Sequence, residues 1–259
     1  MHLVDSHLNR WFKAPNVVRH LRVALLDLYL VLPILSIGQM NKPRSEQQEG
    51  KVATLSKAAM RKQIVAKRLA LSQPELDVSA TALADRLRDA VHWLKLKNVG
   101  TYVPIRGEIS PHQLLASLQP QKVCIPYITD MAAGEMHFCS ADLNVLTNPR
   151  LMQSSDVPRN SYGIPEPITS TVPVPVRQLD ALFVPLVAFD RFGCRLGLGA
   201  GFYDRAFAFR LNRRAAARPL LIGLAHNFQE FKKVESQYWD VPMDAIITPA
   251  KIIWPQGSH

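Results

Sequence analysis

Apolar positions recur along the chain with two different periods, and these periods predict both helices and strands. Ser72 and Glu75 have the spacing of an N-terminal capping box and start one of the helices. An apolar stripe that runs to Leu94 continues this helix, and Asn98 ends it. Three further helices are predicted at residues 54–71, 112–118 and 202–211.

Short apolar runs bounded by Pro, Gly, Asn or Asp predict strands between these helices. The runs cover residues 99–103, 123–128, 182–189, 220–225 and 245–248. Strands that alternate with helices indicate an α/β fold, so we expect a single domain whose mainly parallel central sheet is flanked by helices in a Rossmann-like, three-layer arrangement. Ligands of such a sheet bind at the carboxyl ends of its strands.

The N-terminal segment has a different pattern from the rest of the chain. Residues 21–37 form an apolar run that contains two charges and a proline, which makes it short for a membrane span and poor as a signal peptide. We expect a poorly ordered leader and linker at 1–51, with a weak membrane anchor or a start at a later methionine such as Met40 as alternatives. The folded domain is expected at 52–254 and a tail at 255–259.

Charge indicates an anionic partner. The 259 residues include 31 Lys and Arg against 21 Asp and Glu, a net charge of +10. This balance is typical of proteins that bind nucleic acid, an anionic membrane or an anionic small molecule. Six of the basic residues lie in 51–70, where no acidic or aromatic residue accompanies them. Nucleic-acid binding by stacking needs aromatic side chains, so we expect no nucleic-acid partner, and a basic nucleic-acid-binding module is kept as a rival hypothesis.

The cysteines indicate a cellular compartment. There are three, widely spaced and without a C-x-x-C pair: Cys124, Cys139 and Cys194. An odd number at such spacing argues against a disulfide framework or a zinc site. We therefore expect a reducing, cytoplasmic environment.

The segment RLGLGAGFYDR, residues 195–205, carries the clearest chemical signal. Its three alternating glycines let the backbone turn sharply and bring N–H groups close to a ligand, as in phosphate-binding turns. Two arginines add positive charge, and Asp204 adds a carboxylate that can hold Mg²⁺. The spacing G-x-G-x-G differs from the dinucleotide and P-loop fingerprints. Taken alone, the turn is compatible with a structural role as well as with phosphate binding.

Several segments together resemble the bacterial 5-formyltetrahydrofolate cyclo-ligase family, also known as methenyltetrahydrofolate synthetases. The resemblance covers about residues 53–254, and its most specific element is the glycine turn after a V-P-x-x-A-F-D strand. The matching segments, in order, are KAAMRKQIVAKRLALS, VGTYVPIRGEISPHQLL, KVCIPYI, YGIPEP, LDALFVPLVAFDRFGCRLGLGAGFYDR, IGLAHNFQ and WDVPMDAIITP. Ala200 departs from the family, because many members have Gly or Lys there.

The resemblance implies a ligase that closes a ring. ATP and Mg²⁺ would drive the conversion of 5-formyltetrahydrofolate, with or without a polyglutamate tail, to 5,10-methenyltetrahydrofolate, with release of ADP and phosphate. The formyl oxygen would attack the γ-phosphate to give a phosphorylated iminium carbon, which N10 would then attack. The resemblance also implies a cytoplasmic monomer. A sugar-phosphate isomerase or a CoA-transferase-like enzyme on a similar scaffold remains the rival enzyme hypothesis.

The resemblance also implies which residues bind ATP. The N-terminal K-x-x-x-R pattern falls on Lys57 and Arg61, which helical spacing places on one face together with Arg68. We assign Lys62, Lys67 and Arg68 mainly to the solvated surface. The ATP-binding turn comprises Arg195, Leu196, Gly197, Leu198, Gly199, Ala200, Gly201, Phe202 and Tyr203. The expected catalytic residues are Arg195, Tyr203 and Asp204.

The folate and metal sites follow from the same resemblance. The substrate-binding residues would be Val103, Glu108, Leu198, Gly199, Ala200, Gly201 and Phe202. Asp204 and Asp244 would be the metal ligands, with Asp240 as an alternative to Asp244. Turn chemistry alone explains the loop around Glu166, and a lone histidine such as His226 is more often a hydrogen-bonded structural residue.

Overall fold

The computed structural model describes residues 55–91, 96–130, 132–161, 163–211 and 218–255. The leader expected at 1–51 lies outside these residues, and so does most of the expected tail. The chain divides into the units Met1–Ser56 and Lys57–His259. The description below concerns the second unit, and none of the helices described is both long and apolar enough to cross a bilayer.

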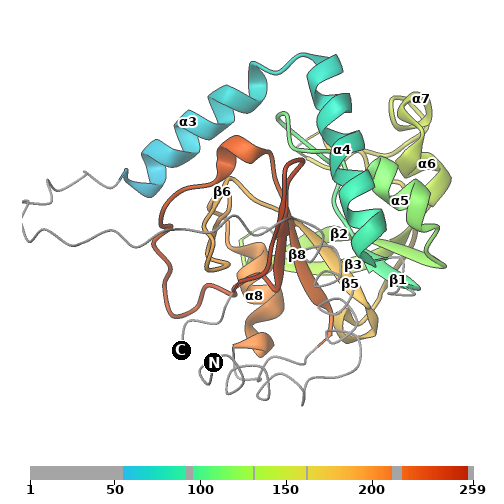
Figure 1. Ribbon diagram of the computed structural model, residues 1–259. Coiled ribbons are helices and arrows are strands. Elements are labelled where there is room, and N and C mark those ends of the chain that lie inside the picture. The colour runs from blue at the N-terminus through green and yellow to red at the C-terminus, as the bar shows by residue number, and fades with distance from the viewer. Residues whose placement is uncertain (1–54, 92–95, 131, 162, 212–217, 256–259) are drawn as a thin grey trace, which may run out of the picture. The chain divides into compact units, whose positions relative to one another are not determined.

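An eight-stranded sheet forms the centre of this unit (Figure 1). Its order is β10-β9-β8-β5-β1-β2-β3-β4, and the five strands from β9 to β2 run parallel, whereas β10, β3 and β4 join antiparallel. The strands are β1 (Asn98–Gly100), β2 (Lys122–Asp130), β3 (Glu135–Ala141), β4 (Ile168–Pro173), β5 (Ala181–Pro185), β8 (Leu220–Leu224), β9 (Ala245–Ile247) and β10 (Ile252–Ile253). The expected α/β fold with a mainly parallel sheet is thereby confirmed.

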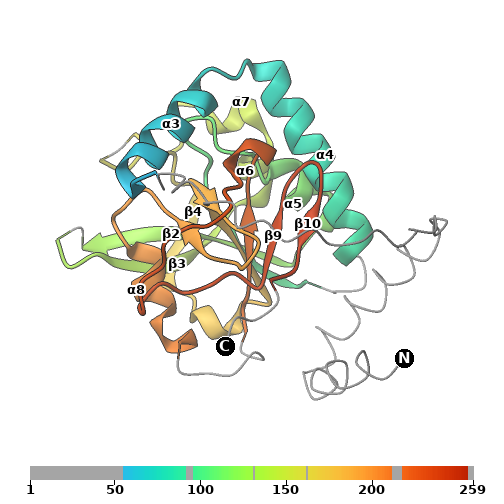
Figure 2. The same ribbon diagram turned by 60° about the vertical axis from the view of Figure 1, so that its left-hand side comes forward.

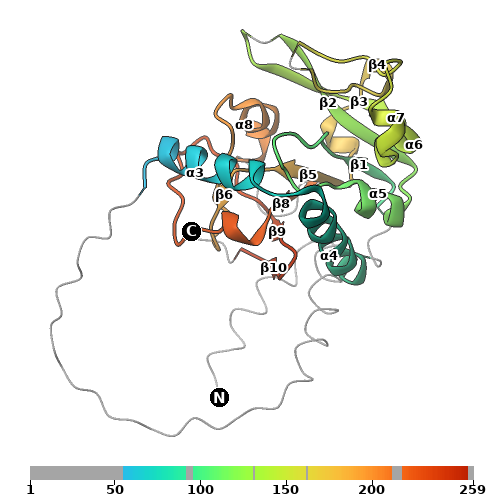
Figure 3. The ribbon, with the colours of Figure 1, turned by 90° about the horizontal axis from the view of Figure 1, so that it is seen from above.

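Helices cover both faces of the sheet. They are α3 (Lys57–Leu69), α4 (Gln73–Val91), α5 (His112–Leu118), α6 (Leu143–Thr147), α7 (Pro149–Met152), α8 (Phe202–Phe207) and the short 3₁₀ turns η1 (Val176–Gln178), η2 (Ala208–Arg210) and η3 (Asn227–Gln229). Seen from above, α4 and α5 lie on one side of the sheet and α8 on the other (Figure 3). The hairpin of β9 and β10 lies beside α4, where Arg86 Nε donates to the Pro249 carbonyl at 3.0 Å (Figure 2).

The core follows the alternation of the strands. Leu182 and Val184 of β5 point to the face that α8 covers, and there they pack in one cluster with Phe138 of β3 and Phe207 of α8. All four side chains are buried. On the other side, α4 contributes buried Leu83, and its start at Ser72 has the glutamate half of the predicted capping box, since Glu75 Oε2 accepts from Ser72 N at 2.8 Å and from Ser72 Oγ at 2.6 Å.

The structure divides the strand predicted at 182–189 into two. β5 ends at Pro185, and the chain then forms β6 (Ala188–Phe189), which pairs with β7 (Arg195–Leu196) in a separate two-stranded sheet. Apolar character continues through both pieces because both are buried. The hairpin of β6 and β7 ends at the start of the glycine turn, so this break in the strand decides where the turn lies.

Candidate active site

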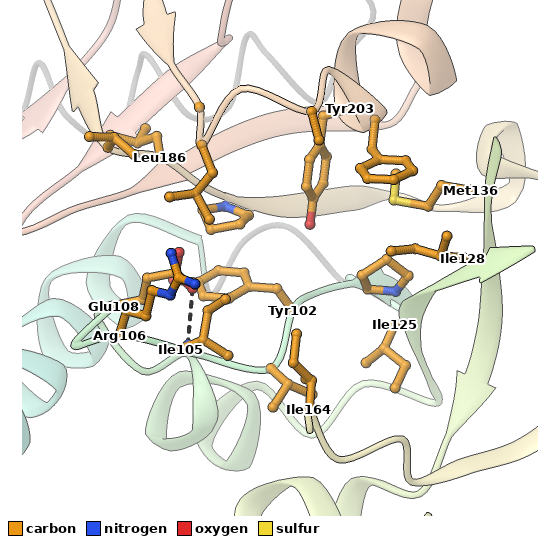
Figure 4. Close-up of a pocket in the computed structure, with 18 of the residues that line it drawn as sticks. Tyr102, Ile105, Arg106, Glu108, Ile125, Ile128, Met136, Ile164, Leu186 and Tyr203 are labelled. Carbon is orange, nitrogen blue, oxygen red and sulfur yellow. Dashed lines mark hydrogen bonds between the residues drawn. The ribbon is translucent and has the colours of Figure 1, made fainter. Parts of the chain in front are cut away.

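A cavity of about 500 Å³ lies at the carboxyl ends of the parallel strands, as the α/β fold predicts. Its walls come from the residues that follow β1 and β5, the second half of β2, the loop before β4, and the glycine turn (Figure 4). The expected site residues that line it are Val103, Glu108, Arg195, Gly197, Leu198, Gly199, Ala200, Gly201, Phe202, Tyr203 and Asp204. Segments almost a hundred residues apart therefore share one cavity.

Glu108 belongs to a tight turn that leaves β1. Arg106 and Gly107 have φ angles of +49° and +69°, and Glu108 N donates to the Ile105 carbonyl at 3.0 Å. The Glu108 carboxylate folds back over this turn, where Oε2 accepts from Ile105 N at 3.1 Å. Burial raises the pKa of Glu108, and the guanidinium of Arg68 opposes this change. The turn thus presents a buried carboxylate to the cavity.

Arg68 corrects a prediction, because it does not belong to the solvated surface. Its side chain is 0% exposed, and Nη1 lies 3.6 Å from Glu108 Oε1. Lys62 and Lys67, which share the helix, are exposed as expected. Composition cannot separate these three basic residues, since only the packing of α3 decides which one faces the protein.

The glycine turn adopts backbone angles that favour glycine. Gly199 and Gly201 have φ angles of +117° and +69°, and Gly201 is the N-cap of α8. Arg61 lies against this turn, because its Nε donates to the Gly197 carbonyl at 2.9 Å. From the other side, Arg205 Nη2 donates to the Ala200 carbonyl at 2.6 Å. Two arginines therefore hold carbonyl groups of the turn.

Arg195 and Asp204 close the base of the turn. Arg195 Nη2 donates to Asp204 Oδ1 at 2.6 Å, and Arg195 Nη1 donates to the Val241 carbonyl. Val241 N in turn donates to Asp204 Oδ1 at 3.1 Å. Among the described residues, Asp204 Oδ2 makes no hydrogen bond, and the side chain is 25% exposed. Asp204 thus lines the cavity with one carboxylate oxygen that has no partner among the described residues.

Lys57, Arg61 and Leu196 do not line the cavity itself. Lys57 Nζ lies 3.9 Å from Asp240 Oδ2, and its side chain remains 30% exposed. Leu196 is buried in a cluster with Met60 of α3. Arg61 therefore lies on α3 next to the glycine turn, Lys57 lies one helical turn before it, and Leu196 anchors the turn by packing.

Asp244 is not brought to the cavity. Both of its carboxylate oxygens accept from Arg210 Nη2 at 2.7 Å, and Oδ2 also accepts from Leu221 N at 2.8 Å. Burial raises its pKa, and the Arg210 guanidinium opposes that change. Its expected metal role stays a prediction, because these contacts alone explain the residue. No cluster of three His, Cys, Asp or Glu side chains suited to a metal occurs among the described residues.

Two tyrosines face the cavity with different roles. The Tyr102 hydroxyl donates to the Ile109 carbonyl at 2.6 Å, so it braces the turn that contains Glu108. The Tyr203 hydroxyl points into the cavity (Figure 4). Burial raises the pKa of Tyr203 far above its usual value, so its hydroxyl stays protonated and can donate a hydrogen bond to a ligand.

Sequence reasoning missed most of the apolar wall. Figure 4 shows side chains that project toward one space from segments far apart along the chain, and those missed are Tyr102, Ile105, Ile125, Ile128, Met136, Ile164 and Leu186. Nothing in the sequence distinguishes them from core residues.

Glu166 and Asn160 also line the cavity, and Asn160 Nδ2 donates to Glu166 Oε1 at 3.1 Å. The match of YGIPEP to a family loop was the signal that could have identified Glu166.

His226 has the structural role that was expected. The residue is 2% exposed, and Nε2 lies 3.1 Å from the Gly107 carbonyl, to which it must donate. Burial lowers its pKa and keeps the ring neutral. His226 therefore stabilises the turn that carries Glu108 through the Gly107 carbonyl, and it does not line the cavity.

Comparison with known proteins identifies relatives for nearly the whole of the described unit. The family model for 5-formyltetrahydrofolate cyclo-ligases matches residues 53–249. A 5-formyltetrahydrofolate cyclo-ligase from Haemophilus influenzae is 33% identical over 181 residues, which cover 69% of this chain and 88% of that protein. The Escherichia coli protein of the same name is 33% identical over 157 residues, with coverage of 60% and 79%.

Solved structures give the same result. The NMR structure of Aquifex aeolicus 5,10-methenyltetrahydrofolate synthetase aligns with a TM-score of 0.61 and 26% identity, covering 78% of this chain and 94% of that one. A 5,10-methenyltetrahydrofolate synthetase from Mycoplasma pneumoniae aligns with a TM-score of 0.55 and 25% identity, covering 75% and 99%.

Proposed function

The chain belongs to the 5-formyltetrahydrofolate cyclo-ligase family, and on this premise we propose that it converts 5-formyltetrahydrofolate to 5,10-methenyltetrahydrofolate, with hydrolysis of ATP to ADP and phosphate. One observation carries the proposal. The turn of Glu108 and the glycine turn, both expected ligand-binding motifs, line the same cavity. A ring closure driven by ATP needs folate and nucleotide sites that meet in this way.

The folate would bind between Glu108 and the apolar wall. A carboxylate accepts hydrogen bonds from the N–H groups of a pterin ring, and apolar side chains cover the faces of the ring. Glu108 is 9% exposed, and the wall includes Ile128, Met136 and Ile164. Leu198, Gly199, Ala200, Gly201 and Phe202 would line the region where the formyl group meets the nucleotide.

ATP would bind along the glycine turn. The turn offers backbone N–H groups next to the cavity, and Arg61 lies against it with its guanidinium about 3.6 Å from the position of a Cβ atom on Gly199. Lys57 lies one helical turn before Arg61 and is partly exposed. These two cations would contact the phosphates: Arg61 lies against the turn, and the partly exposed Lys57 precedes it on the same helix and lies near Asp240.

The donor set near the turn fits Mg²⁺ in its usual protein environment. Magnesium bound with a nucleotide needs only one or two carboxylates, because the phosphates and water supply the other ligands. Asp204 lines the cavity, and its Oδ2 has no hydrogen bond to the described residues. Asp204 would therefore hold the ion, and the ion would neutralise charge on the phosphates. Asp244 would bind the same ion only after its carboxylate is released from Arg210.

The reaction needs positioning and charge stabilisation more than proton transfer. The formyl oxygen attacks the γ-phosphorus, the bond from that phosphorus to ADP breaks, and N5 stabilises the formyl carbon as an iminium. N10 then attacks this carbon and loses its proton, and phosphate departs with the former formyl oxygen. Arg195 and Tyr203 would stabilise the oxygens that carry charge, Arg195 as a fixed cation and Tyr203 as a neutral hydrogen-bond donor.

We also propose a cytoplasmic monomer that acts on folates with or without a polyglutamate tail and binds no nucleic acid. The described cysteines are free, which fits a reducing compartment. Arg68 is buried and Arg61 contacts Gly197, so the basic helix offers little continuous surface for a nucleic acid. Size-exclusion chromatography with light scattering measures the oligomeric state.

The decisive experiment is an absorbance assay. Purified protein with 5-formyltetrahydrofolate, ATP and Mg²⁺ should produce the near-ultraviolet absorbance of methenyltetrahydrofolate, together with one ADP for each ring closed. Omission of ATP or of Mg²⁺ should abolish the signal. An isomerase or a CoA transferase would not depend on ATP, so product formed without ATP would contradict the proposal, as would no product from folded protein in the full mixture.

A further inference from the structure

Helix α3 connects the two halves of the cavity. Arg61 contacts the glycine turn through Gly197, and Arg68, seven residues later and thus on the same helical face, reaches the turn that carries Glu108. Met60 and Ile64 on the inner side of α3 are buried at 3% and 0% exposure. The helix is thus fixed against the protein between these two contacts.

The turn that carries Glu108 rests directly on the main chain of α3. A Cβ atom on Gly107 would lie 2.4 Å from the Arg68 carbonyl oxygen, closer than atoms can approach, and Gly107 has a φ of +69°. His226 Nε2 holds the Gly107 carbonyl from another side at 3.1 Å. The main chain of Arg68 therefore sets the position of the turn, and its side chain reaches over the turn to the carboxylate.

The Arg68 side chain has an unusual environment. It is wholly buried, and its nearest partners are Glu108 Oε1 at 3.6 Å and the Leu186 carbonyl at 3.5 Å. Among the described residues, its Nε and Nη2 atoms have no hydrogen-bond partner. A buried cation with incomplete hydrogen bonds costs stability, and an apolar residue of similar size at such a position is often more stable. Stability alone therefore does not account for an arginine here.

We propose that Arg68 is a positioning residue for the reaction, which keeps Glu108 ionised and aimed into the cavity so that it can accept hydrogen bonds from the pterin. This inference rests on the proposed function and assigns a role to a residue that touches neither ligand. Arg68 does not line the cavity, and Glu108 does. The guanidinium therefore acts only through the carboxylate.

The other groups that face Glu108 cannot replace this charge. Arg106, in the same turn, is exposed, so water screens it. Tyr102 and Tyr203 both have pKa values raised by burial and are neutral. His226, which faces Arg68, is kept neutral by burial. Burial itself favours the protonated form of Glu108, so Arg68 supplies the main opposing influence.

The test removes the charge and follows the Glu108 carboxyl directly. Protein labelled with ¹³C at glutamate carboxyl carbons is titrated by NMR without substrate, and the Glu108 signal is identified by its loss in Glu108→Gln. Arg68→Met should raise the pKa of Glu108 by about 1 to 3 units. The matched control is Lys62→Met, which removes an exposed cation from the same helix and should leave the titration unchanged.

The kinetic readout follows from the same change. In Arg68→Met, the acid limb of kcat/KM for the folate should move to higher pH, and activity should recover at alkaline pH. Arg68→Lys keeps the positive charge and should return the acid limb of kcat/KM most of the way to its wild-type pH. In a Glu108→Gln background, Arg68→Met should change kcat/KM less than twofold, as expected for residues that act as one unit.

Two results overturn the inference: a folded Arg68→Met protein whose Glu108 titrates as in the wild type, or a loss of activity that is independent of pH and equal with and without Glu108. If Arg68→Met fails to fold, Arg68→Gln is measured in the same way and decides by the same criteria. The carboxyl titration needs neither ATP nor turnover. A wild-type protein that forms no methenyltetrahydrofolate would refute the proposed function, whereas the titration would still judge the role of Arg68.

Discussion

Arg195 Nη2 lies 2.6 Å from Asp204 Oδ1, and this ion pair joins the two ends of the glycine turn across its base. Both residues also bond to the main chain of Val241, so a third segment is held at the same point. Both of these contacts of Asp204 use Oδ1, and the residue also lines the cavity. The Asp204 carboxylate thus makes structural contacts through Oδ1 and is also the proposed ligand of Mg²⁺. A substitution can separate these two roles.

Asp204→Asn keeps a carbonyl oxygen for Val241 N but removes the negative charge. If Asp204 holds Mg²⁺, kcat should fall by about 10²- to 10³-fold, as when a group that stabilises transition-state charge is lost. The dependence of the rate on Mg²⁺ concentration should shift to higher concentrations, and the protein should stay folded with a lower thermal midpoint, because the buried Arg195 loses the charge of its partner. Asp156→Asn, an exposed aspartate remote from the cavity lining, is the control. An unchanged magnesium titration would show that Asp204 has only a structural role.

Arg61→Ala should affect the nucleotide more than the folate. The side chain holds the Gly197 carbonyl and has guanidinium nitrogens beside Gly199, so its loss removes both a brace and a phosphate contact. We expect KM for ATP to rise about 10- to 100-fold, the usual effect of losing a charged hydrogen bond, with KM for the folate within about twofold. Isothermal calorimetry with ADP measures the same loss without turnover. Lys62→Ala, on the adjacent exposed position, should behave as the wild type, and an equal change in both KM values would contradict a specific role at the nucleotide.

Gly199→Ala and Gly197→Ala separate backbone strain from steric contact. A Cβ atom on Gly199 would make only ordinary contacts, at 3.6 Å, but the φ angle of this residue is +117°. A Cβ atom on Gly197 would lie more than 4 Å from all atoms beyond its own chain neighbours, and the φ angle of Gly197 is not in the left-handed region. Gly199→Ala should therefore lower the free energy of unfolding by about 1 to 3 kcal/mol, and Gly197→Ala should leave it within about 0.5 kcal/mol. Urea denaturation of both variants measures this. Equal stability of the two would mean that the turn can relax freely.

His112 should make stability depend on pH. Burial lowers its pKa from 6.5 to about 4, and Nε2 is buried without a partner among the described residues. Between these values the unfolded chain binds the proton and the folded chain does not, so the histidine contributes full stability above pH 6.5 and loses it as pH falls toward 4. The loss is at most about 1.4 kcal/mol for each pH unit.

His112→Gln removes this titration. The free energy of unfolding of the wild type, relative to the variant, should decrease steadily from pH 6.5 to pH 4 and stay constant above pH 7. Urea denaturation at a series of pH values provides the comparison. A difference that does not vary with pH would show that the ring is accessible to water and protons in the folded protein.

Local patterns were sufficient for several elements. The helix predicted at 112–118 has those bounds in the structure, and the Glu75 side chain bonds back to Ser72 N as the capping-box spacing indicates. The strands at 220–225 and 245–248 appear within one residue of their expected ends. These features depend on residues that are neighbours along the chain, so the sequence contains the necessary information.

Other elements escaped prediction because their signal is not local. β3 has side chains of mixed exposure and lies between β2 and β4, so it shows neither a continuous apolar run nor a clean alternation. The run 182–189 reads as one strand, although it turns at Pro185 into the hairpin with Arg195. The helix expected at 202–211 ends at Phe207 and continues as a 3₁₀ turn to Arg210.

The sequence by itself determined the fold class and placed Arg61 and Arg68 on one helical face, and its family resemblance predicted the glycine turn and Glu108 as binding elements. Only the tertiary structure decided that Arg68 is buried against Glu108, that Asp244 is bound by Arg210, and that scattered apolar residues form one wall. Motif spacing and helical periodicity are properties of the continuous chain. Burial and ion pairing depend on which distant segments pack together, and basic or apolar residues of one type look alike until that packing is known.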